Sequence, residues 1–191
     1  MKNHVCHLCT SKPTLNFDFS MAFQPIVDLT DKSILSYEAL VRGSNNEPAA
    51  SVFARINNIN IYRFDQLCRM KAIELAARHK LKTRLSINFM PGAVYSPARC
   101  LRSTLETASR FDFPIERICF EVVESRKVQN LDYLQDIINT YQNLGFSTIF
   151  DDFGTGFASY EWLAVLNPDA IKIDMSVVRD VDKQKKKQII L

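Results

Sequence analysis

Ile149-Phe150-Asp151-Asp152-Phe153-Gly154-Thr155-Gly156-Phe157-Ala158-Ser159-Tyr160 places two adjacent carboxylates directly after an apolar run. The apolar residues 146–150 predict a short buried strand, and a helical pattern begins after the two glycines. Carboxylates at the edge of a core are costly unless a cation lies beside them. A hard divalent metal ion is the natural partner. A hydrated Asp-Gly turn is the alternative for this motif taken alone, so the other strand ends become informative.

Helices and short apolar strands alternate along the chain from residue 62 onward. Strands are predicted at 21–27, 34–41, 84–89, 117–123, 146–150 and 170–173, and helices at 62–80, 98–111, 130–144 and 158–166, with a polar loop at 44–50. This alternation favours parallel strands covered by helices. A doubly wound open sheet and a (β/α)8 barrel both fit it. A dinucleotide-binding fold does not, because Gly154-Thr155-Gly156 comes late and lacks the third glycine.

Polar side chains stand at or just after the C-terminal ends of these predicted strands. They are Glu38, Asn88, Glu121, Glu124, Asp151, Asp152, Lys172 and Asp174. A lone Glu there is usually solvated and a lone Asn usually forms a turn, but in a parallel barrel all of them would meet at the mouth where active sites lie. Carboxylates with an amide suit Mg²⁺ or Mn²⁺ better than zinc.

The same residue types suit phosphodiester hydrolysis. Asp151 and Asp152 could bridge two ions, which would activate a water and stabilise the attacking and leaving oxygens. Lys172 could orient that water or neutralise the phosphate. The planar guanidinium of Arg42 could hold two phosphate oxygens at once.

Composition indicates an ordinary globular domain. The chain has 191 residues, of which 47% are hydrophobic, and its net charge of +3 is too small to indicate binding to nucleic acid or membranes. Without a signal peptide or an 18-residue apolar run, we expect a cytoplasmic protein that does not insert into a membrane. Five cysteines predict reduced thiols. His4-Val5-Cys6-His7-Leu8-Cys9 could bind zinc, but the lack of a second ligand pair favours an ordinary N-terminus.

The order of the motifs matches one known family. Over residues 22–174 the chain carries Phe23-Gln24-Pro25-Ile26-Val27, Glu38-Ala39-Leu40 with Arg42, Ser86-Ile87-Asn88, Glu121-Val122-Val123-Glu124-Ser125, Asp151-Asp152-Phe153-Gly154-Thr155-Gly156 and Ile171-Lys172-Ile173-Asp174. This set resembles the signatures of EAL domains, the bacterial phosphodiesterases that linearise cyclic di-GMP. Phe89-Met90-Pro91 departs from the usual apolar-Ser-Pro of the family. The resemblance implies an α/β fold, a modified TIM (β/α)8 barrel whose first strand runs antiparallel to the others.

The resemblance also implies residue roles. It assigns one Mg²⁺ or Mn²⁺ ion to Glu38, Asn88, Glu121 and Asp151, and a second ion to Asp152. Lys172 would position the attacking water, and Glu124 would brace the loop after Asp152, which in this family supports dimerisation and metal uptake. Contacts to the ligand would come from Gln24, Leu40, Arg42 and Asp174. The implied partners are cyclic di-GMP and a second copy of the chain, with no nucleic acid.

Two departures from the family affect the expectation. The segment 43–62 is shorter than the corresponding segment of the family. The family also continues beyond the position of Leu191 with two more strands. We therefore expect a leader at 1–20 and a partial EAL domain at 21–191 that ends within a helix, as a fragment or with a partner chain covering the open sheet edges. The basic run at 182–191 fits a solvated helix face better than a nucleic-acid tail. Two functions stay open: a metal-dependent phosphodiesterase that yields linear pGpG, and a catalytically inactive receptor or protein-interaction module.

Overall fold

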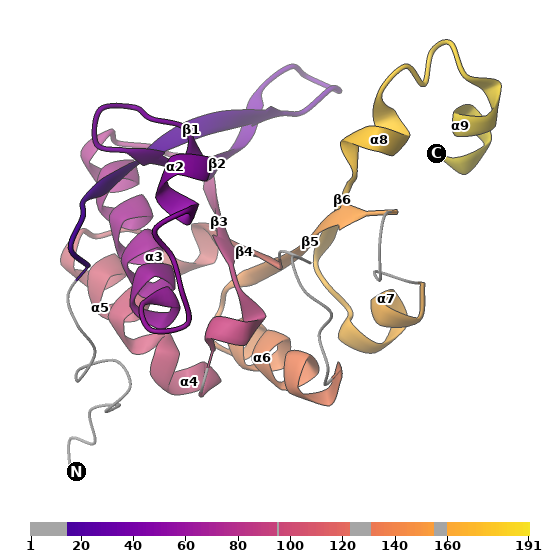
Figure 1. Ribbon diagram of the computed structural model, residues 1–191. Helices are drawn as coiled ribbons and strands as arrows, with labels where there is room; N and C mark the ends of the chain where they lie inside the picture. Colours follow the sequence, from indigo (N-terminus) through magenta and orange to yellow (C-terminus); the bar gives the residue numbers. More distant parts are fainter. Residues whose placement is uncertain (1–14, 95, 123–130, 155–159) are drawn as a thin grey trace.

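The computed structural model describes residues 15–94, 96–122, 131–154 and 160–191. Within these ranges, six strands form one sheet in chain order (Figure 1). They are β1 (Phe19–Val27), β2 (Ile34–Gly43), β3 (Arg84–Phe89), β4 (Ile118–Val122), β5 (Ser147–Phe153) and β6 (Ala170–Ile173). β1 runs antiparallel to β2, and the remaining neighbours pair in parallel. This is the α/β arrangement of a modified TIM barrel with an antiparallel first strand, as predicted.

Most of the helices cover one side of the sheet, and the last two lie beyond its β6 edge (Figure 1). Those described are α2 (Ala49–Phe53), α3 (Ile61–Arg78), α4 (Pro97–Cys100), α5 (Arg102–Arg110), α6 (Leu131–Asn143), α7 (Tyr160–Leu166), α8 (Met175–Val178) and α9 (Lys185–Ile190), with 3-10 turns at Pro91–Ala93 and Ile115–Arg117. α3 packs on β3 and α5, while α6 packs on β5 and α7 (Figure 1). Gly145 ends α6 in the left-handed region, at a φ of +93°.

The core lies between the sheet and these helices. Neighbouring residues in a strand point to opposite sides. On β3 and β4 the large apolar residues therefore face the helices, and the ring of Phe120 packs at a tilt against that of Tyr141 of α6, with centroids 4.8 Å apart. The alternate residues, including Asn88 and Glu121, face the other side of the sheet. The apolar packing thus fixes which side chains are left to form a polar site.

Three predicted elements differ in detail. The expected helix over 98–111 begins at Pro97, where a missing N–H is tolerated, and is divided into α4 and α5 at Leu101. The expected polar loop at 44–50 ends in the short helix α2, which buries Val52 beside Phe64. β5 continues past residue 150 to Phe153, so that both aspartates belong to the strand.

Several further expectations concern single groups. Three of the five cysteines lie in the described ranges, and Cys68, Cys100 and Cys119 are free thiols in buried positions. The His4–Cys9 cluster lies outside the described residues. None of the helices in the described ranges has the length and apolar character that a bilayer span requires.

The β6 edge of the sheet presents apolar surface. β6 is the last strand in the order of the sheet, and its residues Ile171 and Ile173 are 42% and 41% exposed.

Candidate functional site

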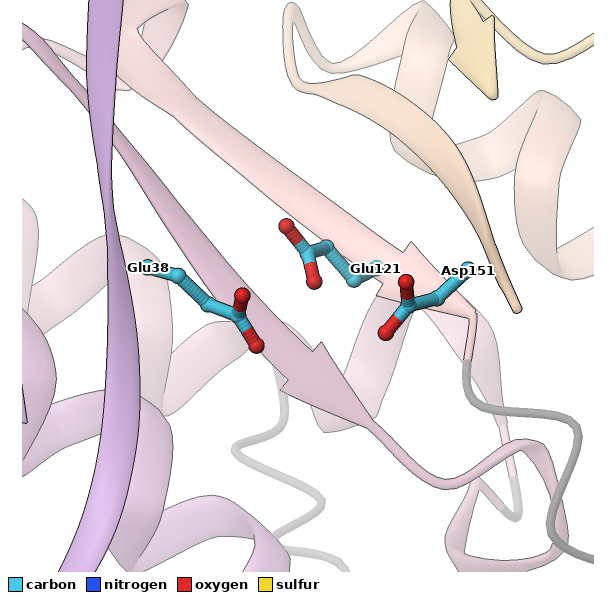
Figure 2. A group of neighbouring side chains, drawn as sticks. All are labelled: Glu38, Glu121 and Asp151. Carbon is cyan, nitrogen blue, oxygen red and sulfur yellow. The ribbon is translucent and has the colours of Figure 1, made fainter. Parts of the chain in front are cut away.

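Three carboxylates from three different strands meet at one point. Figure 2 shows Glu38 of β2, Glu121 of β4 and Asp151 of β5 with their carboxylates turned toward one another. One oxygen of each lies within 4.8 Å of the others. Carboxylates this close repel one another unless a positive charge lies among them. The cluster is therefore a candidate cation site.

Lys172 of β6 supplies a positive charge at this point. Its Nζ lies 2.9 Å from Glu38 Oε2, 2.8 Å from Glu121 Oε2 and 3.1 Å from Asp151 Oδ1. Burial alone would lower the pKa of Lys172, but the bonds to Glu121 and Glu38 raise it above its ordinary value. Lys172 is consequently a charged ammonium held by all three carboxylates.

Asn88 adds an amide to the cluster. It lies opposite Glu121 in the parallel register of β3 and β4, and its Nδ2 donates to Glu38 Oε1 at 3.0 Å. The same amide carries an oxygen, a ligand type that Mg²⁺ and related ions accept. The structure thus brings together Glu38, Asn88, Glu121, Asp151 and Lys172, which the sequence predicted to converge.

Glu121 is the most deeply buried member of the cluster. Its side chain is 0% exposed, and Oε1 is a buried atom without a hydrogen-bond partner among the described residues. Burial, and to a lesser degree the carboxylates of Glu38 and Asp151, raise the pKa of Glu121 to about 7 against the opposing effect of Lys172. A buried oxygen without a partner, within a set of hard oxygen ligands, fits a divalent cation.

The raised pKa of Glu121 predicts a pH-dependent stability. Its pKa in the folded protein exceeds the ordinary value of 4.5, so the folded state binds this proton more tightly than the unfolded chain. The resulting stability is complete below about pH 4.5 and is lost as the pH rises through about 7. In EDTA, we expect the free energy of unfolding of the wild type, relative to Glu121→Gln, to fall by about 3 kcal/mol over that range. Urea unfolding of both proteins across the range measures this, and a constant difference would contradict the raised pKa.

Asp152 lies beside the cluster but is not a member of the three-carboxylate group. The register between β5 and β6 shifts between Phe150 and Phe153, and Asp152 takes a φ of +55°, which is unfavourable for a residue with a side chain. Burial, and then the charges of Asp151 and Asp174, raise the pKa of Asp152. Asp152 therefore lies within electrostatic reach of both Asp151 and Asp174.

Asp174 caps the short helix α8. Its Oδ1 accepts from the N–H of Ser176 at 2.6 Å. Hydrogen bonds from the side chain of Ser176 and then from its N–H lower the pKa of Asp174. Asp174 is thus an ionised carboxylate next to Asp152, one residue beyond the end of β6.

The predicted ligand contacts lie near the cluster on β1 and β2. Gln24 is exposed and pairs across the antiparallel ladder with Glu38. Leu40 and Arg42 follow Glu38 at two-residue intervals and so share its side of β2. Arg42 is half-buried, and its Nη1 donates to Val41 O at 2.7 Å. Glu124 lies outside the described residues.

Sequence comparison connects the chain with one family. The family model described as EAL domain matches residues 13–191. The blue light- and temperature-regulated antirepressor BluF of Escherichia coli (strain K12) is 29% identical over 186 residues, which cover 96% of this chain and 45% of BluF. The cyclic di-GMP phosphodiesterase PdeF of the same organism is 30% identical over 179 residues, which cover 87% of this chain and 23% of PdeF. The chain therefore spans less than half the length of either relative.

Structural comparison finds the same fold in solved proteins. A standalone versatile EAL protein from Vibrio cholerae O395, in its cyclic di-GMP-bound form, superposes with a TM-score of 0.89 and 49% identity over 93% of this chain and 75% of that chain. Klebsiella pneumoniae BlrP1, in a manganese and cyclic di-GMP complex at pH 9.0, superposes with a TM-score of 0.83 and 28% identity over 93% of this chain and 45% of BlrP1. The six-stranded sheet is thus the arrangement found in EAL proteins.

Proposed function

The chain belongs to the EAL domain family, and on this premise we propose that it is a metal-dependent phosphodiesterase that hydrolyses cyclic di-GMP to linear pGpG. The observation that carries the proposal is the convergence of Glu38, Glu121 and Asp151 on one point, with a buried Glu121 oxygen that lacks a partner among the described residues. The relatives agree with it, since PdeF is a cyclic di-GMP phosphodiesterase and BlrP1 forms a complex with manganese and cyclic di-GMP.

The metal ligands proposed are those that the cluster provides. Glu38, Asn88, Glu121 and Asp151 would hold one Mg²⁺ or Mn²⁺ ion, and Asp152 a second. When bound, such ions lower the pKa of a water molecule and stabilise negative charge on phosphoryl oxygens. The oxygen-only ligand set supports Mg²⁺ or Mn²⁺ over zinc. Glu121 has to lose its proton to act as a ligand, so metal binding should strengthen as the pH rises through about 7.

The chain's own cations would act on the substrate. The Lys172 ammonium, already held at the three carboxylates, would orient the attacking water and neutralise charge that develops on the phosphate. The planar guanidinium of Arg42 would donate hydrogen bonds to the phosphate once its present hydrogen bond to the Val41 carbonyl is broken. Gln24, Leu40 and Asp174 would contact the remainder of the dinucleotide from β1, β2 and the end of β6.

A second candidate function is a receptor without catalysis. BluF, which matches 96% of this chain, is an antirepressor, so an EAL domain of similar sequence belongs to a protein with a regulatory role. A receptor would bind cyclic di-GMP without opening it, or would bind another protein. The homodimer implied by the family resemblance stays a prediction under either function.

Turnover of cyclic di-GMP separates the two candidates. The purified chain is incubated with cyclic di-GMP and Mg²⁺ or Mn²⁺, with Ca²⁺ as the control, and the products are resolved by chromatography. A phosphodiesterase yields pGpG with Mg²⁺ or Mn²⁺ only. Bound but unchanged cyclic di-GMP under all three conditions would favour the receptor and contradict the proposal.

A further inference from the structure

A pair of opposite charges is buried on the helix side of the sheet. Asp65 and Arg69 lie one turn apart on α3, are 2% and 0% exposed, and form an ion pair of 2.5 Å between Oδ2 and Nη2. Taking two charges out of water is expensive unless each is well matched. Neither residue was predicted from the sequence as functional, because the helical pattern there was defined by its apolar positions.

Arg69 connects α3 to the two central strands. Its guanidinium carbon lies 5.7 Å from the ring centroid of Phe89, 5.3 Å from that of Phe120 and 5.9 Å from that of Tyr141. Its Nη1 also donates to the Tyr141 hydroxyl at 3.1 Å. Phe89 belongs to β3 and Phe120 to β4. One buried cation therefore interacts with the rings of both strands on the helix side of the sheet.

Asp65 reaches the backbone at the end of β3. Its second oxygen, Oδ1, accepts the N–H of Met90 at 3.1 Å. The ladder between β3 and β4 ends one residue earlier, at the pair Phe89 and Val122. The carboxylate of Asp65 therefore fixes the chain just beyond the last strand pairing, two residues after Asn88.

The opposite side of these strands carries the cation site. Because neighbouring side chains alternate, a Phe89 ring held against Arg69 directs Asn88 toward Glu38, whose Oε1 accepts from Asn88 Nδ2 at 3.0 Å. In the same way, packing of Phe120 on the helix side leaves its neighbour Glu121 on the side of the cation site. Glu121 of β4 lies opposite Asn88 of β3 in the parallel pairing of the two strands. A displaced end of β3 would carry Asn88 away from both carboxylates.

We propose that Asp65, held in place by Arg69, is a positioning residue that fixes the end of β3 and thereby places Asn88 in the cation site. The proposal rests on the proposed function for the ion that Asn88 would bind. A purely stabilising ion pair is the simpler interpretation, but buried pairs can often be replaced by apolar side chains without loss of stability. Such a replacement separates the two roles.

The test variant is Asp65→Leu combined with Arg69→Met in the full chain. It keeps apolar volume behind β3 but removes the acceptor for the Met90 N–H. We expect the variant to fold and to unfold cooperatively on heating. We expect its Mn²⁺ dissociation constant, measured by EPR titration, to rise by about tenfold or more, the size of effect found for residues that orient metal ligands. Ile73→Val, a mild change on the same buried helix face, is the control and should leave Mn²⁺ binding unchanged.

A second readout does not depend on metal. The side-chain amide signal of Asn88, identified in asparagine-labelled protein by its loss in Asn88→Ala, should shift in the double variant and stay in place in Ile73→Val. Unchanged Mn²⁺ binding together with an unchanged amide signal would overturn the positioning role. If the wild type itself bound no Mn²⁺, the proposed function would fail, and the amide shift would still decide the role of Asp65.

If the double variant does not fold, two single variants of Asp65 test the same positioning role. Asp65→Asn keeps an oxygen that can accept from Met90, so its Mn²⁺ affinity should stay within about threefold of the wild type, whereas Asp65→Ala should show the full loss. Equal affinities in the two variants would contradict the proposal.

Discussion

Asp151→Ala is expected to lower kcat for cyclic di-GMP hydrolysis by about 10³-fold or more. Asp151 supplies one of the three converging carboxylates and lies 3.1 Å from Lys172. Its removal takes away a proposed metal ligand and part of the charge that balances Lys172. Because Asp151 stands at the edge of the core with a 16% exposed side chain, the variant should keep its fold.

The measurement for Asp151→Ala is kcat at saturating Mn²⁺ and cyclic di-GMP, with circular dichroism as a check of folding. Asp132→Ala removes an exposed carboxylate from the first turn of α6 and is the matched control. It should turn over at the wild-type rate. Activity of Asp151→Ala within about tenfold of the wild type would exclude Asp151 as a metal ligand.

Lys172→Met is expected to lower kcat for cyclic di-GMP hydrolysis and to raise the affinity for Mn²⁺. The variant keeps an unbranched side chain but removes the charge held at 2.8 to 3.1 Å by three carboxylates. Loss of the group that orients water should lower kcat by about 10²- to 10⁴-fold. Loss of a competing positive charge should tighten Mn²⁺ binding by about tenfold or more at alkaline pH, where Glu121 is ionised.

Steady-state kinetics and an Mn²⁺ titration on the same preparation measure both effects of Lys172→Met. Lys82→Met, at an exposed position before β3, is the control for loss of a lysine. If kcat and Mn²⁺ affinity of Lys172→Met fell together, Lys172 would be needed for the structure of the cluster rather than for chemistry. That result would remove its proposed role at the water.

The convergence of the site could be predicted from the sequence because it follows from strand direction. Asn88, Glu121, Asp151 and Lys172 each stand near the C-terminal end of a parallel strand, and such ends meet at one edge of the sheet. Glu38 was expected there too, but it lies in the middle of β2, from where its side chain reaches Asn88 and Lys172. In β3 and β4, large apolar residues alternate with smaller or polar ones, and this alternation determines which side chains face the site. Periodicity fitted an open sheet and a barrel equally well, and the barrel with an antiparallel first strand was implied by the resemblance to EAL domains.

The position of Asp152 could not be predicted in this way. The sequence places it next to Asp151, and the strand was expected to end at Phe150. The structure continues the strand through a bulge in which Asp152 has a φ of +55°. A left-handed residue inside a strand goes with the shift in register between β5 and the neighbouring β6, and the pattern of residues in β5 alone does not show that shift.

Asp65 and Arg69 were missed for a different reason. Charged residues on a helix are normally exposed, and nothing local marks these two as buried. Their environment is made by Phe89, Phe120 and Tyr141, which come from β3, β4 and α6. Only the assembled fold shows a cation surrounded by these rings and a carboxylate that bonds to the end of β3.

Manganese anomalous scattering would show whether Glu38, Glu121 and Asp151 hold the catalytic cation. Crystals of the full chain would be grown with Mn²⁺ and cyclic di-GMP and measured at the manganese absorption edge. We expect an anomalous peak among these three carboxylates, with the Asn88 amide oxygen beside it and the Lys172 ammonium displaced from its present bonds. Bound cyclic di-GMP without a peak among the three carboxylates, or with one elsewhere on the molecule, would contradict it.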